Sequence, residues 1–303
     1  MSELTIVTAF FDIGRKDFKG KARSNQKYAE FFKFWSRIKN KIVVYTDSVM
    51  AKEVKKIRKE FGLLDKTEVV IIDDVSVIEP NLLKRMEKIS KNETFLNYRY
   101  MDNSADNNAK YDYVMLLKAW CIKDAVEKEL ATGMIAWLDF GYNHGGKTYP
   151  NKEEFDFLWK VDLPKDKVTM FTKKEDDDKP IFQIIQSYEV YVMGAPFIVP
   201  SNLASKLWEE EKRAMISLLD VGFMDDDQTI MLMVSRNTDF VNLVKSNGWN
   251  LALKENGASH LTHIEDKSQI TLKDKLLYKY RVNKRNKKSI NRLKKIFNKD
   301  YLD

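Results

Sequence analysis

The sequence predicts an α/β fold built on a mainly parallel sheet. Three short apolar runs, at residues 4–10, 41–45 and 69–72, alternate with segments of helical periodicity. Such alternation is typical of parallel strands joined by helices. Apolar residues stand at consecutive positions of these runs rather than only at every second residue, which indicates strands covered on both faces. A fourth run, at 135–138, ends at Asp139, and ligands of open parallel sheets bind beyond the carboxyl ends of the strands.

The first half of the chain gives its elements in a regular order. Ser24 or Asn25 is the expected cap of a helix whose apolar side chains recur at i, i+3, i+4 and i+7, namely Tyr28, Phe31, Phe32 and Trp35. Segments 50–61, 80–91 and 111–128 are predicted helices. Residues 92–108 are polar, and we expect an irregular loop there.

The second half is less regular. Gly194 and Pro196 interrupt the apolar run 190–200, which predicts two short strands around a bend. The remaining predicted elements are two helices followed by two short strands, at 201–219, 229–234, 240–244 and 249–253.

Two features of this half have alternative interpretations. The acidic stretch 175–180 contains oxygen ligands suited to a metal, but consecutive carboxylates before Pro180 favour a solvated turn. Trp249 has a ring that can stack on a sugar, but we expect it in the core.

Positive charge is concentrated at the C-terminal end. From residue 271 to 303 there are twelve Lys or Arg against three Asp or Glu, an excess of nine. The whole chain carries +7, so the residues before 271 carry a net charge of −2. A nearly neutral body argues against nucleic-acid binding. We expect a catalytic domain at 1–268 and a basic helical tail at 269–303.

Bulk composition indicates a cytoplasmic chain. Cys121 is the one cysteine, so a disulfide framework is excluded and a reducing compartment is expected. No signal-peptide pattern opens the sequence, and no apolar run approaches the roughly 20 residues of a membrane span.

Familiar catalytic motifs are missing from the sequence. Gly-x-Gly-x-x-Gly does not occur. Asp139-Phe140-Gly141 matches a protein-kinase tripeptide, but the other kinase motifs are absent. Cys121 lies in an apolar helix, which argues against a reactive thiolate. What remains is a set of polar groups at strand ends and helix starts, suited to a nucleotide diphosphate with or without a divalent cation.

Five motifs spread along the body carry a resemblance. They are Ile6-Val7-Thr8-Ala9-Phe10-Phe11-Asp12-Ile13-Gly14-Arg15, Val44-Tyr45-Thr46-Asp47, Lys118-Ala119-Trp120, Trp137-Leu138-Asp139-Phe140-Gly141 and Asp226-Asp227-Gln228. Together they resemble the HtrL/YibB (WlaTC) family of bacterial proteins, over most of the body, and the opening decapeptide is the most specific of them.

The resemblance implies a GT-A-like fold, with a mixed, mainly parallel sheet, and a glycosyltransferase. The family's relatives include galactofuranosyltransferases that build surface polysaccharides. The expected reaction moves a hexose, galactofuranose if those relatives are a guide, from a UDP-sugar to a surface-polysaccharide or lipid-linked glycan, with inversion. A metal-dependent phosphotransferase or phosphohydrolase, and a non-catalytic protein that binds membranes or polyanions, are the alternatives.

The resemblance assigns donor binding first to the segment after the opening strand. Phe11 would supply a ring for the base, Asp12 a carboxylate for an imide or ribose hydroxyl, and Arg15 a guanidinium for phosphate. An ion pair between Asp12 and Arg15 within the loop is the alternative.

Three more residues are expected to contact the donor. Asp47 ends a strand and is either a donor ligand or a helix cap. Lys118 lies in an unusually apolar context, which favours a charge directed at the diphosphate over a surface lysine. Gln228 would orient donor or acceptor hydroxyls.

Asp139 stands where GT-A enzymes carry Asp-x-Asp, whose carboxylates meet the metal and the ribose. Gly141 replaces the second carboxylate, which weakens the expected site for Mn²⁺ or Mg²⁺. By resemblance, His263 or His260 would supply a second ligand, as a C-terminal histidine does in some GT-A families. A surface or core position is the alternative for either histidine.

The acidic triplet 225–227 suits the acceptor side. In inverting GT-A enzymes a carboxylate at a helix start takes the proton of the acceptor hydroxyl. Adjacent carboxylates raise at least one pKa, and the helix N-terminus opposes this. We expect Asp227 to be the base, with Asp226 second. One of the three is expected only to cap the helix.

Apolar residues recur on one face of the predicted tail helix, at Leu272, Leu276, Leu277 and Tyr280, and basic residues fill much of the remainder. Basic amphipathic helices are typical of proteins that bind anionic membrane surfaces. We therefore expect peripheral attachment to the inner face of a bacterial plasma membrane. Docking of the tail on the body is the alternative.

Overall fold

The computed structural model describes residues 2–18, 22–100 and 107–264, and in the tail only 276, 279–280, 282–284 and 286–287. The expected domain boundary at 268 and most of the predicted tail helix therefore lie outside the described residues. Within the described part of the chain, no helix has both the length and the apolar character needed to span a bilayer.

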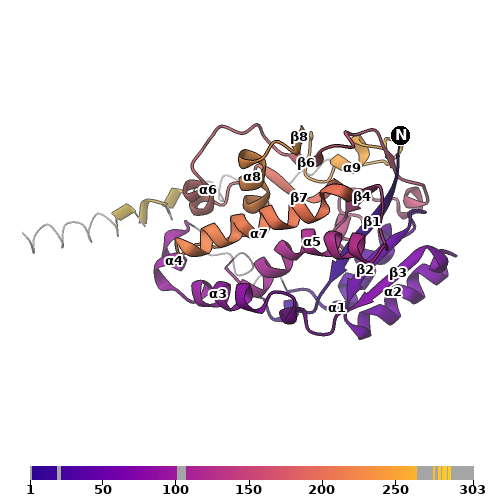
Figure 1. Cartoon of the computed structure of the whole chain (residues 1–303), viewed down its shortest axis with the longest axis horizontal. Coiled ribbons are helices and arrows are strands. Elements are labelled where there is room, and N and C mark those ends of the chain that lie inside the picture. Colours follow the sequence, from indigo (N-terminus) through magenta and orange to yellow (C-terminus); the bar gives the residue numbers. More distant parts are fainter. Residues whose placement is uncertain are drawn as a thin grey trace, which may run out of the picture.

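A mixed sheet, mainly parallel, forms the centre of the fold (Figure 1). Its strands run in the order β3-β2-β1-β4-β7-β6-β8. β7 is antiparallel to β4 and β6, and the other pairings along this order are parallel. The bounds are β1 (Ser2–Phe10), β2 (Ile42–Thr46), β3 (Thr67–Ile71), β4 (Met134–Trp137), β6 (Val168–Thr172), β7 (Val192–Pro200) and β8 (Val241–Lys245), and a short β5 (Lys160–Val161) pairs with the start of β1. The expected α/β fold, with a mixed and mainly parallel sheet, is confirmed.

Helices cover both faces of this sheet. One face packs against α3 (Pro80–Ser90), α5 (Ala109–Glu127), α7 (Ala204–Asp220) and α8 (Asp227–Asn237), with the short α4 (Glu93–Tyr98) and α6 (Ile181–Ser187) joining the same core. The other face packs against α1 (Asn25–Trp35), α2 (Ser48–Glu60) and α9 (Ala252–Glu255). Figure 1 shows α5 and α7 side by side on their face.

Alternation along the strands explains the continuous apolar runs. In β1, Ile6 belongs to the core beneath α1 and α2, whereas Val7 belongs to the core beneath α5 and α7. Successive side chains of a strand point to opposite faces, so a strand covered on both faces is apolar at every position. The predicted strands at 4–10, 41–45, 135–138 and 240–244 are confirmed within one or two residues.

Three segments differ from their predictions. Part of 92–108 is helical, because the Asn92 side chain accepts from Thr94 N at 2.8 Å and caps α4. β7 is one strand rather than two, buried along its whole length between β4 and β6. The predicted strand at 249–253 is wrong, since α9 begins at Ala252, and Ala, Leu, Lys and Glu all favour helix.

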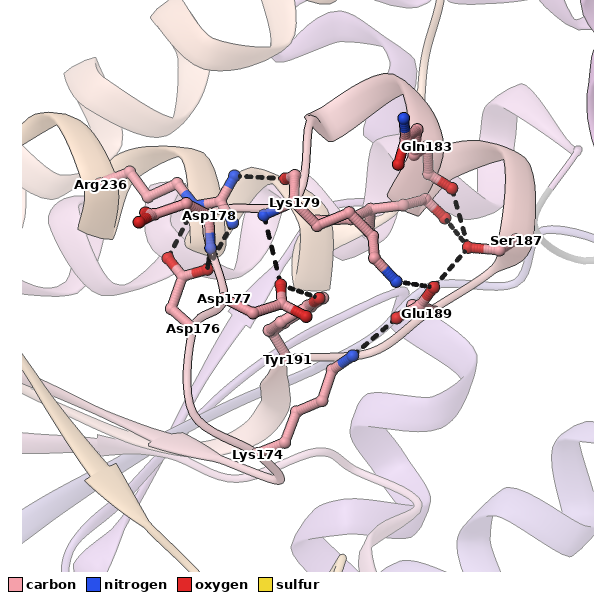
Figure 2. Close-up of polar contacts among 11 residues, drawn as sticks. Lys174, Asp176, Asp177, Asp178, Lys179, Gln183, Ser187, Glu189, Tyr191 and Arg236 are labelled. Carbon is pink, nitrogen blue, oxygen red and sulfur yellow. Dashed lines mark hydrogen bonds and ion pairs between the residues drawn. The ribbon is translucent and has the colours of Figure 1, made fainter.

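Residues 175–178 of the acidic stretch are exposed, as expected for a solvated segment, and ion pairs hold the stretch in place (Figure 2). Arg236 of α8 donates to both carboxylate oxygens of Asp176. Glu189 pairs with Lys174 and Lys179, each at 2.6 Å, and Tyr191 donates to Asp177. We call these residues the surface network: Lys174, Asp176, Asp177, Lys179, Glu189, Tyr191 and Arg236.

Candidate active site

A cavity of about 410 Å³ opens beyond the carboxyl ends of β1 and β4. The loop after each strand, α5, β7 and the first turn of α8 contribute to its wall. Parallel strands bring these ends to one edge of the sheet, where α/β proteins bind their ligands. Among the residues expected from the sequence, those in the wall are Phe11, Asp12, Arg15, Lys118, Asp139, Asp227 and Gln228.

Lys118 lies at the centre of a buried group that we call the Lys118 cluster. Its Nζ lies 2.9 Å from Asp139 Oδ1 and 2.6 Å from Asp227 Oδ2, and donates to the Gly194 carbonyl at 2.9 Å. The ammonium thus donates one hydrogen bond to a carbonyl and forms ion pairs with two carboxylates. Lys118 therefore joins the two carboxylates, and its charge is already paired within the protein.

Gly194 makes this close approach possible. A methyl group at position 194 would lie 2.3 Å from Asp227 Oδ2, closer than any real contact of that kind. The missing side chain is the reason that the Asp227 carboxylate can reach the Lys118 ammonium beside β7. The sequence predicts a bend at Gly194, whereas in the structure this glycine allows the Asp227 carboxylate to pack closely against β7.

Burial sets the charge states in the Lys118 cluster. It raises the pKa of the Asp227 carboxyl, and the adjacent ammonium only partly opposes this. Burial lowers the pKa of Lys118, but the carboxylates of Asp139 and Asp227 outweigh it, and the pKa lies above its ordinary value. Glu211 of α7 is 2% exposed, and burial raises its pKa well above the usual range. The cluster thus holds a charged lysine beside a neutral glutamic acid.

Arg15 supplies a positive charge that forms no ion pair with a carboxylate of the described residues. It is 8% exposed, and its guanidinium carbon lies 4.6 Å from the centre of the Tyr111 ring and 5.1 Å from that of Phe18. Its Nε and Nη1 have no hydrogen-bond partner among the described residues. These donors are suited to an anionic ligand in the cavity.

Asp12 does not form the alternative ion pair with Arg15. Its carboxylate accepts from Gly14 N at 2.9 Å and from Asn25 Nδ2 at 2.8 Å. The Asn25 bond, followed by the Gly14 bond, lowers the pKa of Asp12. The loop is therefore held by Asp12 without engaging the guanidinium.

The acidic triplet divides into three different roles. Asp225 accepts from Arg99 Nη2 and Thr229 Oγ1, each at 2.7 Å, in a buried structural pair. Asp226 caps α8 by accepting from Gln228 N at 3.1 Å, as expected for one member. Only Asp227 of the three lies in the cavity wall.

Asp47 is a helix cap, and it also borders a second hollow. Its Oδ1 accepts from Val49 N at 2.9 Å and from Met50 N at 2.8 Å, at the start of α2. The hollow has a volume of about 180 Å³ and shares Phe11, Asp12 and Ile13 with the main cavity. A ligand that reaches Asp47 therefore has to extend past Asp12.

The two C-terminal histidines lie outside the cavity wall. His260 packs edge-on against Phe157, with ring centres 4.6 Å apart, and its Nε2 lies 3.0 Å from the Glu154 carbonyl. His263 is exposed. Among the described residues, no group of three or more His, Cys, Asp or Glu side chains is arranged to hold a metal ion. The residues present thus do not fit the Mn²⁺ or Mg²⁺ site implied by the resemblance.

His144 is a cavity residue that the sequence analysis missed. It lies in a left-handed turn after β4, with a φ of 46°, and its Nε2 is 3.2 Å from Arg23 Nη1. Desolvation and then the charge of Arg23 lower its pKa to about 4, so the ring is neutral at pH 7. The glycine-rich sequence around it, Gly141-Tyr142-Asn143-His144-Gly145-Gly146, was the available signal.

Trp249 is also in the wall, which corrects its expected core position. The side chain is 40% exposed, in the loop before α9. A polar loop sequence, Ser246-Asn247-Gly248, precedes it and was the signal against a buried strand.

Comparison with solved structures finds glycosyltransferases at low identity. Mouse xyloside xylosyltransferase 1, in its apo form, is 14% identical with a TM-score of 0.42, and the match covers 80% of this chain and 85% of that one. A glycosyltransferase involved in the glycosylation of the major capsid of PBCV-1 is 11% identical with a TM-score of 0.36, and covers 80% and 82% respectively.

Comparison of sequences identifies the family. Protein HtrL of Escherichia coli (strain K12) is 28% identical over 247 residues, which is 77% of this chain and 84% of that protein. A family model described as "Bacterial protein of unknown function (HtrL_YibB)" matches residues 2–255. Since that match spans well over half of the sequence, the chain belongs to the HtrL_YibB family of bacterial proteins.

Proposed function

We propose that this chain is a glycosyltransferase that moves a sugar from a nucleoside-diphosphate donor, a UDP-sugar, to a hydroxyl of a glycan. One observation carries the proposal. A single cavity contains a buried carboxylate of raised pKa, Asp227, and a guanidinium with open donors, Arg15. The first is suited to take a proton from an acceptor hydroxyl, and the second to stabilise a leaving diphosphate.

In the proposed reaction, the acceptor oxygen forms a bond to the anomeric carbon while the bond from that carbon to the diphosphate oxygen breaks. The electron pair of the breaking bond goes to the diphosphate, whose added negative charge faces Arg15. Asp227 takes the hydroxyl proton. Its raised pKa makes it a stronger base than an ordinary aspartate, and the Lys118 ammonium favours its ionised form. A single displacement of this kind inverts the anomeric centre.

The donor's base and ribose would lie toward the smaller hollow, near Phe11, Asp12 and Asp47. Gln228, directly after the proposed base, would orient a hydroxyl. On the acceptor side, the exposed ring of Trp249 offers a face on which a sugar can stack. The family's relatives suggest galactofuranose as the sugar and a surface-polysaccharide or lipid-linked glycan as the acceptor.

We also propose a cytoplasmic location with attachment to an anionic membrane surface. The attachment to the membrane is supported by the positive charge of the tail sequence. Most residues of the tail lie outside the described ones. Sedimentation of the full chain with vesicles containing anionic lipid is expected to be strong at low salt and weak at high salt. Equal sedimentation with uncharged vesicles would contradict attachment by charge.

A thermal-shift screen followed by a hydrolysis assay tests the main proposal. UDP and UDP-sugars should raise the melting temperature of the full chain, since ligand at about 100 times Kd adds roughly 2.7 kcal/mol to the free energy of unfolding. A bound UDP-sugar should also be hydrolysed slowly without acceptor. If no nucleotide-sugar binds or is turned over, in EDTA or in Mn²⁺, the transferase proposal fails.

A further inference from the structure

We infer that the site works without a divalent cation, because the Lys118 ammonium holds the position that such a cation would take. The inference rests on the proposed function and deepens it, since it names the groups that carry positive charge at the donor diphosphate. Three features of the site support it: the surroundings of Gly141, the coordination of Lys118, and the open donors of Arg15.

A side chain at position 141, where an Asp-x-Asp pair has its second carboxylate, would crowd two rings of the protein. A Cβ built at this position would lie 3.2 Å from Tyr28 Cε1 and 3.6 Å from Phe31 Cδ2. Both rings belong to α1, which packs against the turn that follows β4. The Tyr28 ring would have to shift by a few tenths of an ångström to admit a side chain at position 141. The packing of α1 therefore favours glycine there.

One oxygen of Asp139, the carboxylate that remains, is already engaged, and the side chain is 43% exposed. Its Oδ1 accepts from Trp137 Nε1 at 2.8 Å and lies 2.9 Å from Lys118 Nζ. The three oxygens around Nζ come from Asp139, Asp227 and the Gly194 carbonyl. Carboxylate and carbonyl oxygens are the ligands that Mg²⁺ and Mn²⁺ prefer.

A cation would have to expel the ammonium to reach these oxygens. The Lys118 side chain is 3% exposed, and its ammonium is in contact with two carboxylates and one carbonyl. Breaking a buried ion pair by removing one partner is strongly unfavourable. Lys118 therefore fixes the two carboxylates as a metal ion would, at a position that is permanently occupied.

Arginine side chains would then neutralise the negative charge of the diphosphate. Arg15 faces the cavity with Nε and Nη1 unmatched among the described residues, and Arg23 lines the same wall beside His144. A guanidinium stays charged at any physiological pH and binds phosphate oxygens in a forked geometry. Two such groups supply charge comparable to that of one divalent ion.

Manganese titration of the full chain, followed by electron paramagnetic resonance, tests the inference directly. The wild-type protein should leave micromolar Mn²⁺ free, both alone and with UDP, apart from the fraction that UDP itself binds. Hydrolysis of a UDP-sugar should change by less than about twofold between EDTA and Mn²⁺. Tight binding of one Mn²⁺ by the wild type, or a loss of hydrolysis in EDTA that Mn²⁺ restores, would overturn the inference.

Lys118→Ala gives the converse test. Removing the ammonium leaves three oxygens facing one vacated position, so the variant should gain binding of one Mn²⁺ that the wild type lacks. Lys174→Ala is the matched control, because Glu189 of the surface network keeps Lys179 and Ser187 and should gain no Mn²⁺. A folded Lys118→Ala protein that binds no Mn²⁺ would contradict the assignment.

The two proposals fail separately. If UDP and UDP-sugars bind under no condition, the transferase proposal falls, while the Mn²⁺ titrations of wild type and Lys118→Ala still decide whether the ammonium holds a cation's place. If hydrolysis occurs but requires Mn²⁺, the transferase proposal survives and the metal-independent site is wrong.

Discussion

The Lys118 cluster and the surface network are built from the same residue types, yet burial gives them opposite properties. In the surface network, hydrogen bonds from Arg236 and from Tyr191 lower the carboxyl pKa of Asp176 and of Asp177 respectively. In the Lys118 cluster, burial raises the pKa of Asp227, and the neighbouring Glu211 shifts in the same direction. The side chain of Glu189 is 28% exposed, whereas that of Asp227 is 4% exposed.

The difference separates stability from chemistry. A carboxyl whose pKa is lowered by folding stabilises the native state at neutral pH, whereas one whose pKa is raised destabilises it. The surface network therefore contributes to the fold. In the Lys118 cluster the raised pKa values of Asp227 and Glu211 cost stability at neutral pH, whereas the raised pKa of Lys118 acts in the opposite direction. The cluster lies in a cavity beside the open donors of Arg15. A costly arrangement of this kind is expected where a protein needs a strong base or a fixed charge.

Asp227→Asn should show the largest difference in activity between the Lys118 cluster and the surface network. Asparagine keeps the volume but cannot take a proton, so donor transfer should fall by about 10²- to 10⁴-fold. Asp176→Asn, the matched change in the surface network, should leave transfer unchanged. Steady-state measurement of kcat/KM for both variants checks this.

Full transfer activity in Asp227→Asn would remove the proposed base and leave Asp226 as the next candidate. A large loss in Asp176→Asn, with the fold intact, would show that the surface network also serves the reaction.

Arg15→Gln should have the next largest effect, on donor binding. It removes the guanidinium donors that face the cavity, so the Kd for UDP should rise by about 10- to 100-fold, as expected for charge-assisted hydrogen bonds. Arg236→Gln is the control in the surface network. It should lower the melting temperature and leave the Kd unchanged. Calorimetric titration with UDP measures both, and equal Kd values for wild type and Arg15→Gln would contradict the assignment of the phosphate site.

Much of the fold was predictable because it depends on local pattern. Runs that are apolar at every position identified the central strands, and Ser24 was recognised as the cap of α1. The strand-end position of Asp139 and the apolar context of Lys118 pointed to the cavity without any knowledge of pairing. These signals lie within a few residues of each position.

Other features depend on contacts between distant segments. Lys118 and Asp227 meet only because α5 and α8 pack on the same face of the sheet, and Gly194 gives them room. No local sequence pattern indicates a contact between Lys118 and Asp227, so the sequence alone predicts that Lys118 binds the diphosphate. The pairing of Asp176 with Arg236 is equally non-local, so the sequence predicts the exposure of the acidic stretch but not its partner on α8.

Glu211→Gln tests whether the buried carboxyl of Glu211, beside the Lys118 cluster, lowers the free energy of unfolding. The folded pKa of Glu211 lies well above its unfolded value, so the native state holds an extra proton and stability falls as pH rises between the two values. Glutamine abolishes this dependence. The variant should gain roughly 1 kcal/mol in free energy of unfolding at pH 8 and much less at pH 4.5. Urea unfolding at both pH values measures the change, and an equal or larger gain at pH 4.5 would contradict the proposed origin.

Glu189→Gln should have the smallest effect and the opposite pH dependence. Burial works to raise the pKa of Glu189, but hydrogen bonds from Lys174, Lys179 and Ser187 outweigh it and hold the pKa at about 2. Because the folded pKa is lowered, the stabilisation is present above the unfolded pKa and is lost as pH falls toward 2. The group is largely solvated, so the loss at pH 7 should be below about 1 kcal/mol, and 1 M salt should reduce it further. Urea unfolding at pH 7 and pH 4, with and without salt, measures the loss. A loss of several kcal/mol that salt does not change would mean that the surface network behaves as a buried one, and the contrast with the Lys118 cluster would disappear.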